Sequence, residues 1–309
     1  MRSTKRRTAS DGTIVSSLLN NTISSPIRLA WRIARPILVA YLLIVLCMMF
    51  LERWLVYPVP PRTAGDWKAT WLPHEDVWFQ SADGTKLHGW FVPHPNSTRA
   101  ILYCHGNGED VASVGELAAH LSEVLRASVF IFDYRGYGHS ESSPNEAGCI
   151  ADGCAAQQWL AKRMNIQPAD VIIIGRSLGS AVAVGVAAEN GARALVLECA
   201  FTTMPDVAAL HYPWLPVRWV MKNRYDNLTR IQHYDGPLLQ SHGTTDTLIP
   251  MTLARTLFDA APSRGKKWLE FNNNGHNDAP PRPYYNDLAA FLDAAISPNG
   301  EEKSPASPK

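Results

Sequence analysis

A serine between two glycines is the first feature of this sequence that could do chemistry. The stretch Gly175-Arg-Ser177-Leu-Gly179 follows the apolar run Val171–Gly175 and precedes an Ala- and Val-rich segment, which predicts a strand, a sharp turn and a helix. In that setting the glycines relieve crowding in the turn and leave the Ser177 hydroxyl exposed. Such a hydroxyl attacks carbonyl carbons once a base takes its proton. The alternative is a tight turn whose serine only caps the helix.

A base and an acid follow Ser177 in the chain order that this chemistry uses. Asp246 lies just after the apolar run 237–241, and His276 lies just after the run 267–271. The carboxyl ends of parallel strands meet at one edge of a sheet, so the three residues are expected at the same edge. A single aspartate or histidine in a loop is usually only solvated. The agreement of order and location nevertheless predicts a catalytic triad of Ser177, Asp246 and His276, with Asp246 rather than Asp278 as the acid.

A glycine-rich loop can supply the hydrogen-bond donors that an oxyanion needs. His105-Gly-Asn107-Gly108 follows the apolar run 100–104, and its glycines allow backbone N–H groups to turn inward. We expect the oxyanion hole to consist of the backbone N–H groups of Asn107 and Leu178, because Leu178 directly follows the nucleophile. His105 is then expected to order the loop rather than act as a base. The alternatives are an ordinary glycine turn and an isolated anion-binding nest.

Short apolar runs alternate with amphipathic stretches between about residues 70 and 296, and this alternation predicts the fold. Val77–Phe79 and Leu87–Val92 flank a turn at 82–85 and predict a β-hairpin. Further runs suit buried parallel strands, and these are 100–104, 128–133, 171–175, 194–198, 237–241 and 267–271. We therefore expect an α/β fold, with a mostly parallel central sheet that carries helices on both faces. Residues 201–235, rich in aromatic residues and proline, interrupt the alternation between two of the strands.

Several motifs in residues 75–295 can be compared with known families, and they are His105–Gly108, Phe132–Ser140, Gly175–Gly179, Gly243–Asp246 and Gly275–His276. Together they resemble the α/β hydrolases, and more narrowly the membrane-anchored, serine-aminopeptidase-like hydrolases of the bud-emergence type. The resemblance implies an α/β-hydrolase domain over residues 74–296 with a short cap at 201–235. It also implies that Asp133, Arg135 and Tyr137 are scaffold around the site. Thr245 departs from relatives that often carry a charged or small residue there.

An apolar stretch near the N-terminus predicts a transmembrane anchor. Ile37–Leu51 carries no charge, and apolar residues return after Glu52-Arg53 at Trp54–Tyr57. About 20 mostly apolar residues in a helix can span a bilayer. A buried core helix and a cleaved signal peptide are the alternatives, but the long basic segment before the stretch and the lack of a small-x-small cleavage motif favour a retained anchor. Residues 1–36 hold seven Lys and Arg and one acidic residue, which predicts a cytoplasmic N-terminus and a catalytic domain on the exoplasmic side, periplasmic, extracellular or lumenal.

Composition excludes several other classes of protein. The 309 residues are 46% apolar and 18% charged, so disorder of the whole chain is excluded. The net charge is +1, and the basic excess lies on the N-terminal tail, which argues against a nucleic-acid partner. The five cysteines form no CxxC pair and no zinc-ligand spacing, so we expect no metal, and nothing in the sequence calls for a cofactor. The expected segments are a basic tail, an anchor, a linker, the hydrolase domain and a disordered tail, at 1–36, 37–57, 58–73, 74–296 and 297–309.

These features predict a membrane-tethered serine hydrolase that cleaves a carboxylic ester or thioester of a small-molecule or lipid acyl substrate. The aromatic residues of 201–235 suit an apolar acyl chain, or else they only pack the cap onto the sheet. One alternative is a serine aminopeptidase or amidase, which would need an acidic pocket for the substrate amine, and Glu109 and Asp110 are the candidates to supply it. Another is a non-catalytic membrane-anchored binding protein on the same fold. Its sequence would lack a member of the triad, and none is missing.

Overall fold

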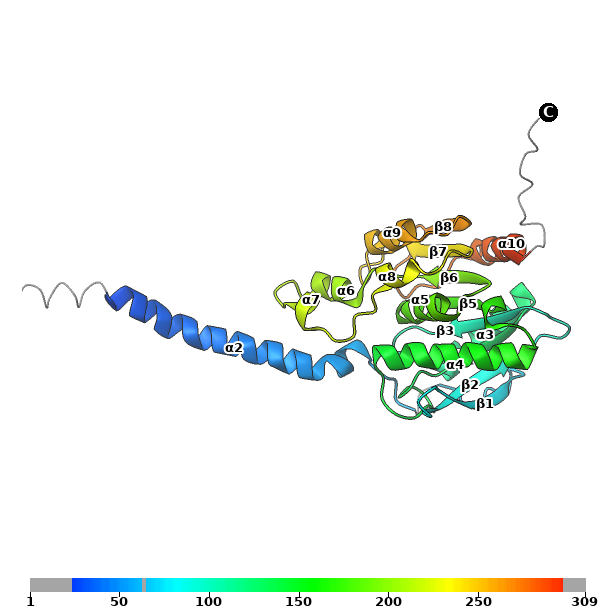
Figure 1. Cartoon of the computed structure of the whole chain (residues 1–309), viewed down its shortest axis with the longest axis horizontal. Helices are drawn as coiled ribbons and strands as arrows, with labels where there is room; N and C mark the ends of the chain where they lie inside the picture. Colours follow the sequence, from blue (N-terminus) through cyan, green and yellow to red (C-terminus); the bar gives the residue numbers. More distant parts are fainter. Residues whose placement is uncertain (1–23, 63–64, 297–309) are drawn as a thin grey trace, which may run out of the picture. The chain divides into compact units, whose positions relative to one another are not determined.

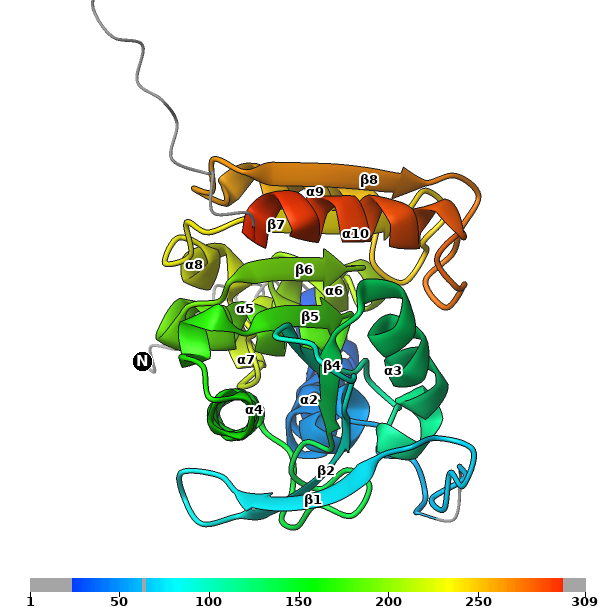
Figure 2. The same ribbon diagram turned by 90° about the vertical axis from the view of Figure 1, so that its right-hand side faces the viewer.

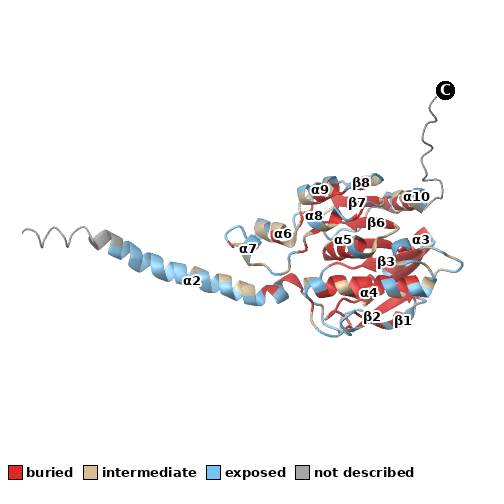
Figure 3. Ribbon diagram, in the orientation of Figure 1, coloured by how far each residue is buried: buried red, intermediate tan, exposed pale blue. Residues whose placement is uncertain are grey.

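The computed structural model describes residues 24–62 and 65–296, which divide into two compact units after Leu51. Most of helix α2 (Ser24–Val56) lies in the first unit, and its side chains are largely exposed (Figure 3). Residues Arg28–Val56 have the length and apolar composition of a membrane span, a test that a signal sequence also passes. The predicted terminal tails lie partly or wholly outside the described residues, at 1–23 and 297–309.

The boundaries of the predicted anchor, 37–57, differ from those of the helix. Among the described residues, α2 already covers 24–36, which are largely good helix formers, and the helix continues through Pro36. At the other end, Glu52 already belongs to the second unit. The first unit therefore ends at Leu51, and residues 52–57 of the predicted anchor lie in the second unit.

Eight strands among the described residues form a single sheet in the order β1-β2-β4-β3-β5-β6-β7-β8 (Figures 1 and 2). They are β1 (Glu75–Gln80), β2 (Lys86–Val92), β3 (Ala100–Cys104), β4 (Ser128–Phe132), β5 (Ile172–Arg176), β6 (Ala194–Glu198), β7 (Leu238–Gly243) and β8 (Lys266–Phe271). β2 runs antiparallel to both β1 and β4, and the other neighbouring pairs are parallel. The α/β fold class, its hairpin and its mostly parallel sheet are thus confirmed.

Helices cover both faces of this sheet (Figure 2). α3 (Val111–Leu125) and α10 (Pro283–Ile296) pack on one face. The other face is covered by α4 (Glu146–Met164), α5 (Leu178–Asn190), α8 (Asn227–Ile231) and α9 (Met251–Ala260). The short 3-10 helix η1 (Pro168–Asp170) precedes β5. Strands β3, β4 and β6 are buried along their whole length, which is why their sequences are continuous apolar runs rather than alternating ones.

The segment between β6 and β7 forms a small cap rather than a further strand. It contains α6 (Met204–His211), α7 (Val217–Val220) and α8. Figure 3 colours most of α6 and α7 as intermediate or exposed. Three of the cap's aromatic side chains are buried and three are exposed. The buried ones are Phe201, Tyr225 and Tyr234, and the exposed ones are Tyr212, Trp214 and Trp219. Packing of the cap onto the body therefore applies to the buried half of these residues, whereas the acyl-chain interpretation stays a prediction for the exposed half.

Candidate active site

Ser177 occupies a strained turn at the carboxyl end of β5. Its backbone has φ 53° and ψ −118°, a conformation that residues other than glycine rarely adopt. The two neighbouring glycines are required because the backbones approach closely. A Cβ at Gly175 would lie 2.3 Å from the carbonyl oxygen of Gly179, and one at Gly179 would lie 2.0 Å from that of Cys104. The turn therefore holds the Ser177 side chain clear of β5 and α5, as a nucleophile requires.

The structure brings Ser177, His276 and Asp246 together. His276 Nε2 lies 3.0 Å from Ser177 Oγ, and His276 Nδ1 lies 2.7 Å from Asp246 Oδ2. The three residues follow β5, β8 and β7, so all of them lie at the carboxyl edge of the sheet. When Nδ1 carries a proton and donates it to Asp246, Nε2 is free to accept the proton of Ser177. The arrangement can therefore work as nucleophile, base and orienting acid.

Asp246 is held by donors on both of its carboxylate oxygens. The backbone N–H groups of Leu248 and Ile249 donate to Oδ1 at 2.9 and 2.8 Å, and Oδ2 faces His276 and also lies 3.3 Å from His242 Nε2. Burial by itself raises the pKa of Asp246, but hydrogen bonds from His242 and His276 outweigh burial and hold that pKa well below its ordinary value. The carboxyl group is therefore ionised at neutral pH and can stabilise a protonated His276.

The loop after β3 lies against the start of α5, where the predicted oxyanion donors are found. A Cβ at Gly179 would lie 2.4 Å from the carbonyl oxygen of His105. Within residues 24–62 and 65–296, the backbone N–H groups of Asn107 and Leu178 donate to no protein acceptor. The N–H of Gly106, in contrast, donates to Glu109 Oε2 at 2.6 Å. Leu178 begins α5, so the positive end of the helix dipole adds to its N–H group.

Comparisons with known proteins agree with this architecture. Residues 99–230 match the family model described as the alpha/beta hydrolase fold. The α/β hydrolase domain-containing protein WAV2 of Arabidopsis thaliana is 30% identical over 258 residues, which cover 76% of this chain and 84% of WAV2. The chain belongs to the α/β hydrolase family.

Two further similarities extend this assignment. An uncharacterised protein of Mycobacterium tuberculosis is 41% identical to this hydrolase over 221 residues, or 71% of this chain and 76% of that protein. A solved structure of the Pyrococcus furiosus esterase Pf2001 matches with a TM-score of 0.60 at 20% identity, covering 76% of this chain and 97% of the esterase. At that level of identity, the structural match supports the fold.

Arg176 joins three parts of the hydrolase's site, and no sequence pattern singled it out. Its Nη2 donates to the carbonyl oxygen of His276 at 2.6 Å, and its Nη1 lies 3.2 Å from Glu109 Oε1. Because the other oxygen of Glu109 accepts from Gly106, the pair connects β5, the His276 loop and the loop after β3. Glu109 is therefore occupied by an ion pair. Asp110 is also occupied, since it caps the first turn of α3.

Three residues that the family resemblance marks as scaffold lie in polar networks around the site. Asp133 is fully buried and lies 3.0 Å from His88 Nδ1. Arg135 pairs with buried Asp152, from Nη2 to Oδ1, at 2.7 Å. Tyr137 donates a hydrogen bond to the side chain of Asn107 at 2.7 Å, so it contacts the loop that carries a predicted oxyanion donor.

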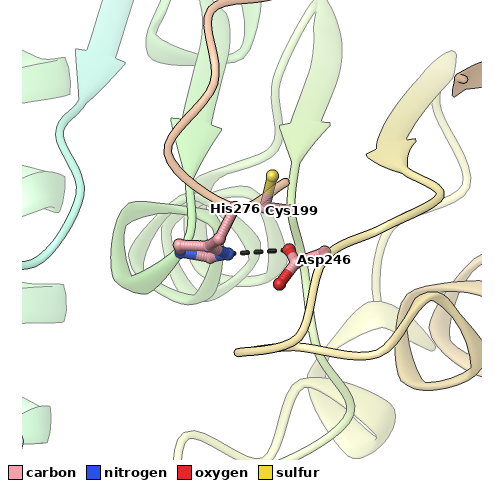
Figure 4. A group of neighbouring side chains, drawn as sticks. All are labelled: Cys199, Asp246 and His276. Carbon is pink, nitrogen blue, oxygen red and sulfur yellow. Dashed lines mark hydrogen bonds and ion pairs between the residues drawn. The ribbon is translucent and has the colours of Figure 1, made fainter. Parts of the chain in front are cut away.

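Cys199 lies beside His276 and Asp246 (Figure 4). Its Sγ, a carboxylate oxygen of Asp246 and a ring nitrogen of His276 lie within 4.8 Å of one another, which is the kind of cluster that can hold a metal ion. Burial, together with the nearby charge of Glu198, raises the pKa of the Cys199 thiol to about 12. Because metals bind the thiolate, a metal ion here would have to displace the proton of this thiol. Among the described residues, Asp246 and His276 are also hydrogen-bonded to each other, and His276 is hydrogen-bonded to Ser177.

The remaining candidates have other partners. Asp278 is exposed, and its Oδ2 accepts a hydrogen bond from the N–H of Gly275 at 2.7 Å, which closes the turn that contains His276. The His105 ring is buried and its Nδ1 lies 2.8 Å from the carbonyl oxygen of Gly106, within its own loop. His242 was not marked as functional by the sequence, yet its Nε2 lies 3.3 Å from Asp246 Oδ2. Its position directly after the apolar run 237–241 was the one available signal in the sequence.

Proposed function

We propose that this α/β hydrolase is a serine hydrolase that cleaves a carboxylic ester or thioester through an acyl-enzyme at Ser177. The observation that carries the proposal is the continuous hydrogen-bond chain from Ser177 Oγ through His276 to Asp246, with distances of 3.0 and 2.7 Å. A non-catalytic binding protein has no need for a strained serine that faces a base held by an ionised acid.

The reaction follows from these contacts. Ser177 Oγ bonds to the acyl carbon while His276 Nε2 takes the hydroxyl proton, and the backbone N–H groups of Asn107 and Leu178 stabilise the resulting oxyanion. Collapse of the tetrahedral intermediate breaks the bond to the leaving oxygen or sulfur, which receives the proton from His276. Water then attacks the acyl-enzyme, again giving its proton to His276. The carboxylic acid leaves, and Ser177 regains its proton.

The substrate class rests on the surroundings of the triad. An aminopeptidase needs an unpaired carboxylate for the substrate amine, but Glu109 is paired with Arg176 and Asp110 caps α3. The exposed aromatic residues of the cap favour an apolar acyl chain. The similarity in fold to the esterase Pf2001 also favours an ester substrate. The proposed substrate is therefore an acyl ester or thioester with an apolar chain.

We also propose that the first unit anchors the hydrolase in a membrane. The span Arg28–Val56 is apolar and long enough, and basic residues predominate before residue 37. This bias favours a cytoplasmic N-terminus and an exoplasmic catalytic domain. Of this span, residues 28–51 lie in the first unit and form the proposed membrane segment, because Glu52 and Val56 belong to the second unit and are buried there.

Ser177→Ala tests the proposed function in the full-length protein, purified in lipid nanodiscs. Turnover of nitrophenyl esters and labelling by a fluorophosphonate should both disappear, with a loss in kcat of about 10⁶-fold. Ser263→Ala is the matched control, because its hydroxyl has no hydrogen-bond partner in the described part of the chain. A panel of nitrophenyl esters of increasing chain length, thioesters and aminoacyl anilides identifies the substrate class. Full turnover by Ser177→Ala would refute the mechanism, and a preference for aminoacyl anilides would refute the substrate class.

A further inference from the structure

Glu52 and Val56 near the end of α2, and Tyr57 just after it, are buried in the second unit, although most described residues of α2 are exposed. Glu52, Val56 and Tyr57 are only 7%, 8% and 3% exposed. A carboxylate at this depth is costly unless hydrogen bonds compensate for the lost water. Residues 52–57, called the helix-end segment below, therefore have specific partners in the hydrolase body.

Glu52 binds the cap at the connection between α7 and α8. Its Oε1 accepts hydrogen bonds from the backbone N–H groups of Lys222 and Asn223 at 3.0 and 2.8 Å, and from Asn223 Nδ2 at 2.9 Å. Three donors on one carboxylate oxygen fix the position of residues 222–223 relative to the end of α2. Lys222 N also lies 3.1 Å from Oε2.

Tyr57 extends this connection into the core beneath the cap. Its hydroxyl donates to Asn223 Oδ1 at 2.9 Å and lies 3.0 Å from the hydroxyl of Tyr225, which is fully buried. The same Asn223 Oδ1 accepts from the backbone N–H of Glu146 at the start of α4, at 2.9 Å. The helix-end segment is thus bonded to the cap and, through Asn223, is connected to the start of α4.

Val56 makes the contact that reaches the active site. Its carbonyl oxygen accepts a hydrogen bond from Asn107 Nδ2 at 2.6 Å, and Asn107 Oδ1 accepts from Tyr137 at 2.7 Å. Both ends of the Asn107 amide are therefore held, one by α2 and one by the body. Val56 is the last residue of the helix, where backbone carbonyls have no partner within the helix.

We infer that the helix-end segment positions the oxyanion loop, so that Glu52 and Val56 act on catalysis through Asn107. The inference rests on the proposed function, in which the backbone N–H of Asn107 stabilises the oxyanion. A donor must lie about 2.7–3.1 Å from that oxygen to be effective, and a displacement of about 1 Å can cost about 100-fold in rate. Glu52 and Val56 are positioning residues, because neither contacts the reacting atoms.

Glu52→Ala in the full-length protein tests the connection at its far end. It leaves the N–H groups of residues 222 and 223 without their acceptor. We expect kcat to fall about 10- to 100-fold with KM little changed. Affinity for phenylboronic acid, whose adduct with Ser177 places an anionic oxygen in the oxyanion hole, should fall in parallel. Glu52→Gln keeps an acceptor oxygen and should recover most of the activity.

Glu75→Ala is the matched control for Glu52→Ala. Glu75 lies on β1, its side chain is 48% exposed, and it pairs with Arg163 at the surface. Its removal should leave kcat and the affinity for phenylboronic acid within about twofold of the parent protein, since exposed ion pairs contribute little. Circular dichroism and gel filtration give the folded fraction of every variant, so kcat is expressed per folded molecule.

Asn107→Ala keeps the proposed N–H donor but cuts the connection at the loop. If Glu52 acts through Asn107, adding Glu52→Ala to Asn107→Ala causes no further loss in kcat beyond about twofold. Losses that multiply would overturn the inference, as would a Glu52→Ala variant with normal kcat and normal affinity for phenylboronic acid. The proposed function fails separately, if Ser177→Ala remains active.

Discussion

Asp246→Asn should inactivate the hydrolase by forcing His276 into the wrong tautomer. Asp246 Oδ1 accepts from the backbone N–H groups of Leu248 and Ile249 at 2.9 and 2.8 Å, so the remaining oxygen of an asparagine would keep that place. Its NH₂ group would then face His276 Nδ1, at the position where Oδ2 now lies 2.7 Å away. Nδ1 must become an acceptor, the ring proton moves to Nε2, and His276 can no longer take the proton of Ser177.

The size of the loss in kcat can be worked out because Asp246→Asn removes His276 as the base but keeps the fold. In serine proteases, replacing the triad aspartate by asparagine with the geometry intact lowers kcat by about 10⁴-fold. That factor corresponds to about 5 kcal/mol of transition-state stabilisation. The assay is the acylation rate of the full-length protein with a nitrophenyl ester, measured in the pre-steady state, with circular dichroism to confirm folding.

Asp278→Asn is the control for this prediction. Asp278 is exposed and accepts its hydrogen bond from Gly275, so its replacement should leave acylation within about threefold of the parent rate. Two results would refute the tautomer argument. One is an Asp246→Asn variant that loses less than about tenfold, and the other is an Asp278→Asn variant that proves the more damaging of the two.

Two further predictions concern side chains near the site, and a third concerns the orientation of the chain in the membrane. Arg176→Met should lower kcat about 10- to 100-fold and Glu109→Gln less, because only Arg176 holds the His276 carbonyl; equal losses in steady-state kcat would contradict this. Burial raises the pKa of Glu198 more than hydrogen bonding lowers it, so the stability that its protonation gives is present at low pH and is lost as pH rises through the folded pKa. Glu198→Gln should therefore raise the thermal unfolding midpoint most at alkaline pH and least at mildly acidic pH, and a shift independent of pH would contradict this. Protease added from the exoplasmic side of intact membranes should cleave the chain after residue 57 and spare a tag at the N-terminus, whereas digestion of the tag alone would reverse the orientation.

The sequence by itself determined the fold class and the local setting of Ser177. Strand identity could be read from apolar runs, because strands buried on both faces are rich in apolar side chains. The turn at Ser177 could be read from its glycines, because the close approach of neighbouring backbone leaves no room for a Cβ. The order of strands and loops also led to Asp246 and His276, which the structure brings within hydrogen-bond distance of one another.

Only the tertiary structure decided which groups support these residues. Arg176 and His276 are 100 residues apart in sequence, and Asn107 and Val56 are 51 apart, so no local pattern links them. The sequence also treated Trp54–Tyr57 as the end of an apolar anchor, whereas Val56 and Tyr57 are buried in the body. Hydropathy reports only that a side chain avoids water. Whether lipid or protein covers it depends on where the rest of the folded chain lies, and that is fixed by packing between distant segments.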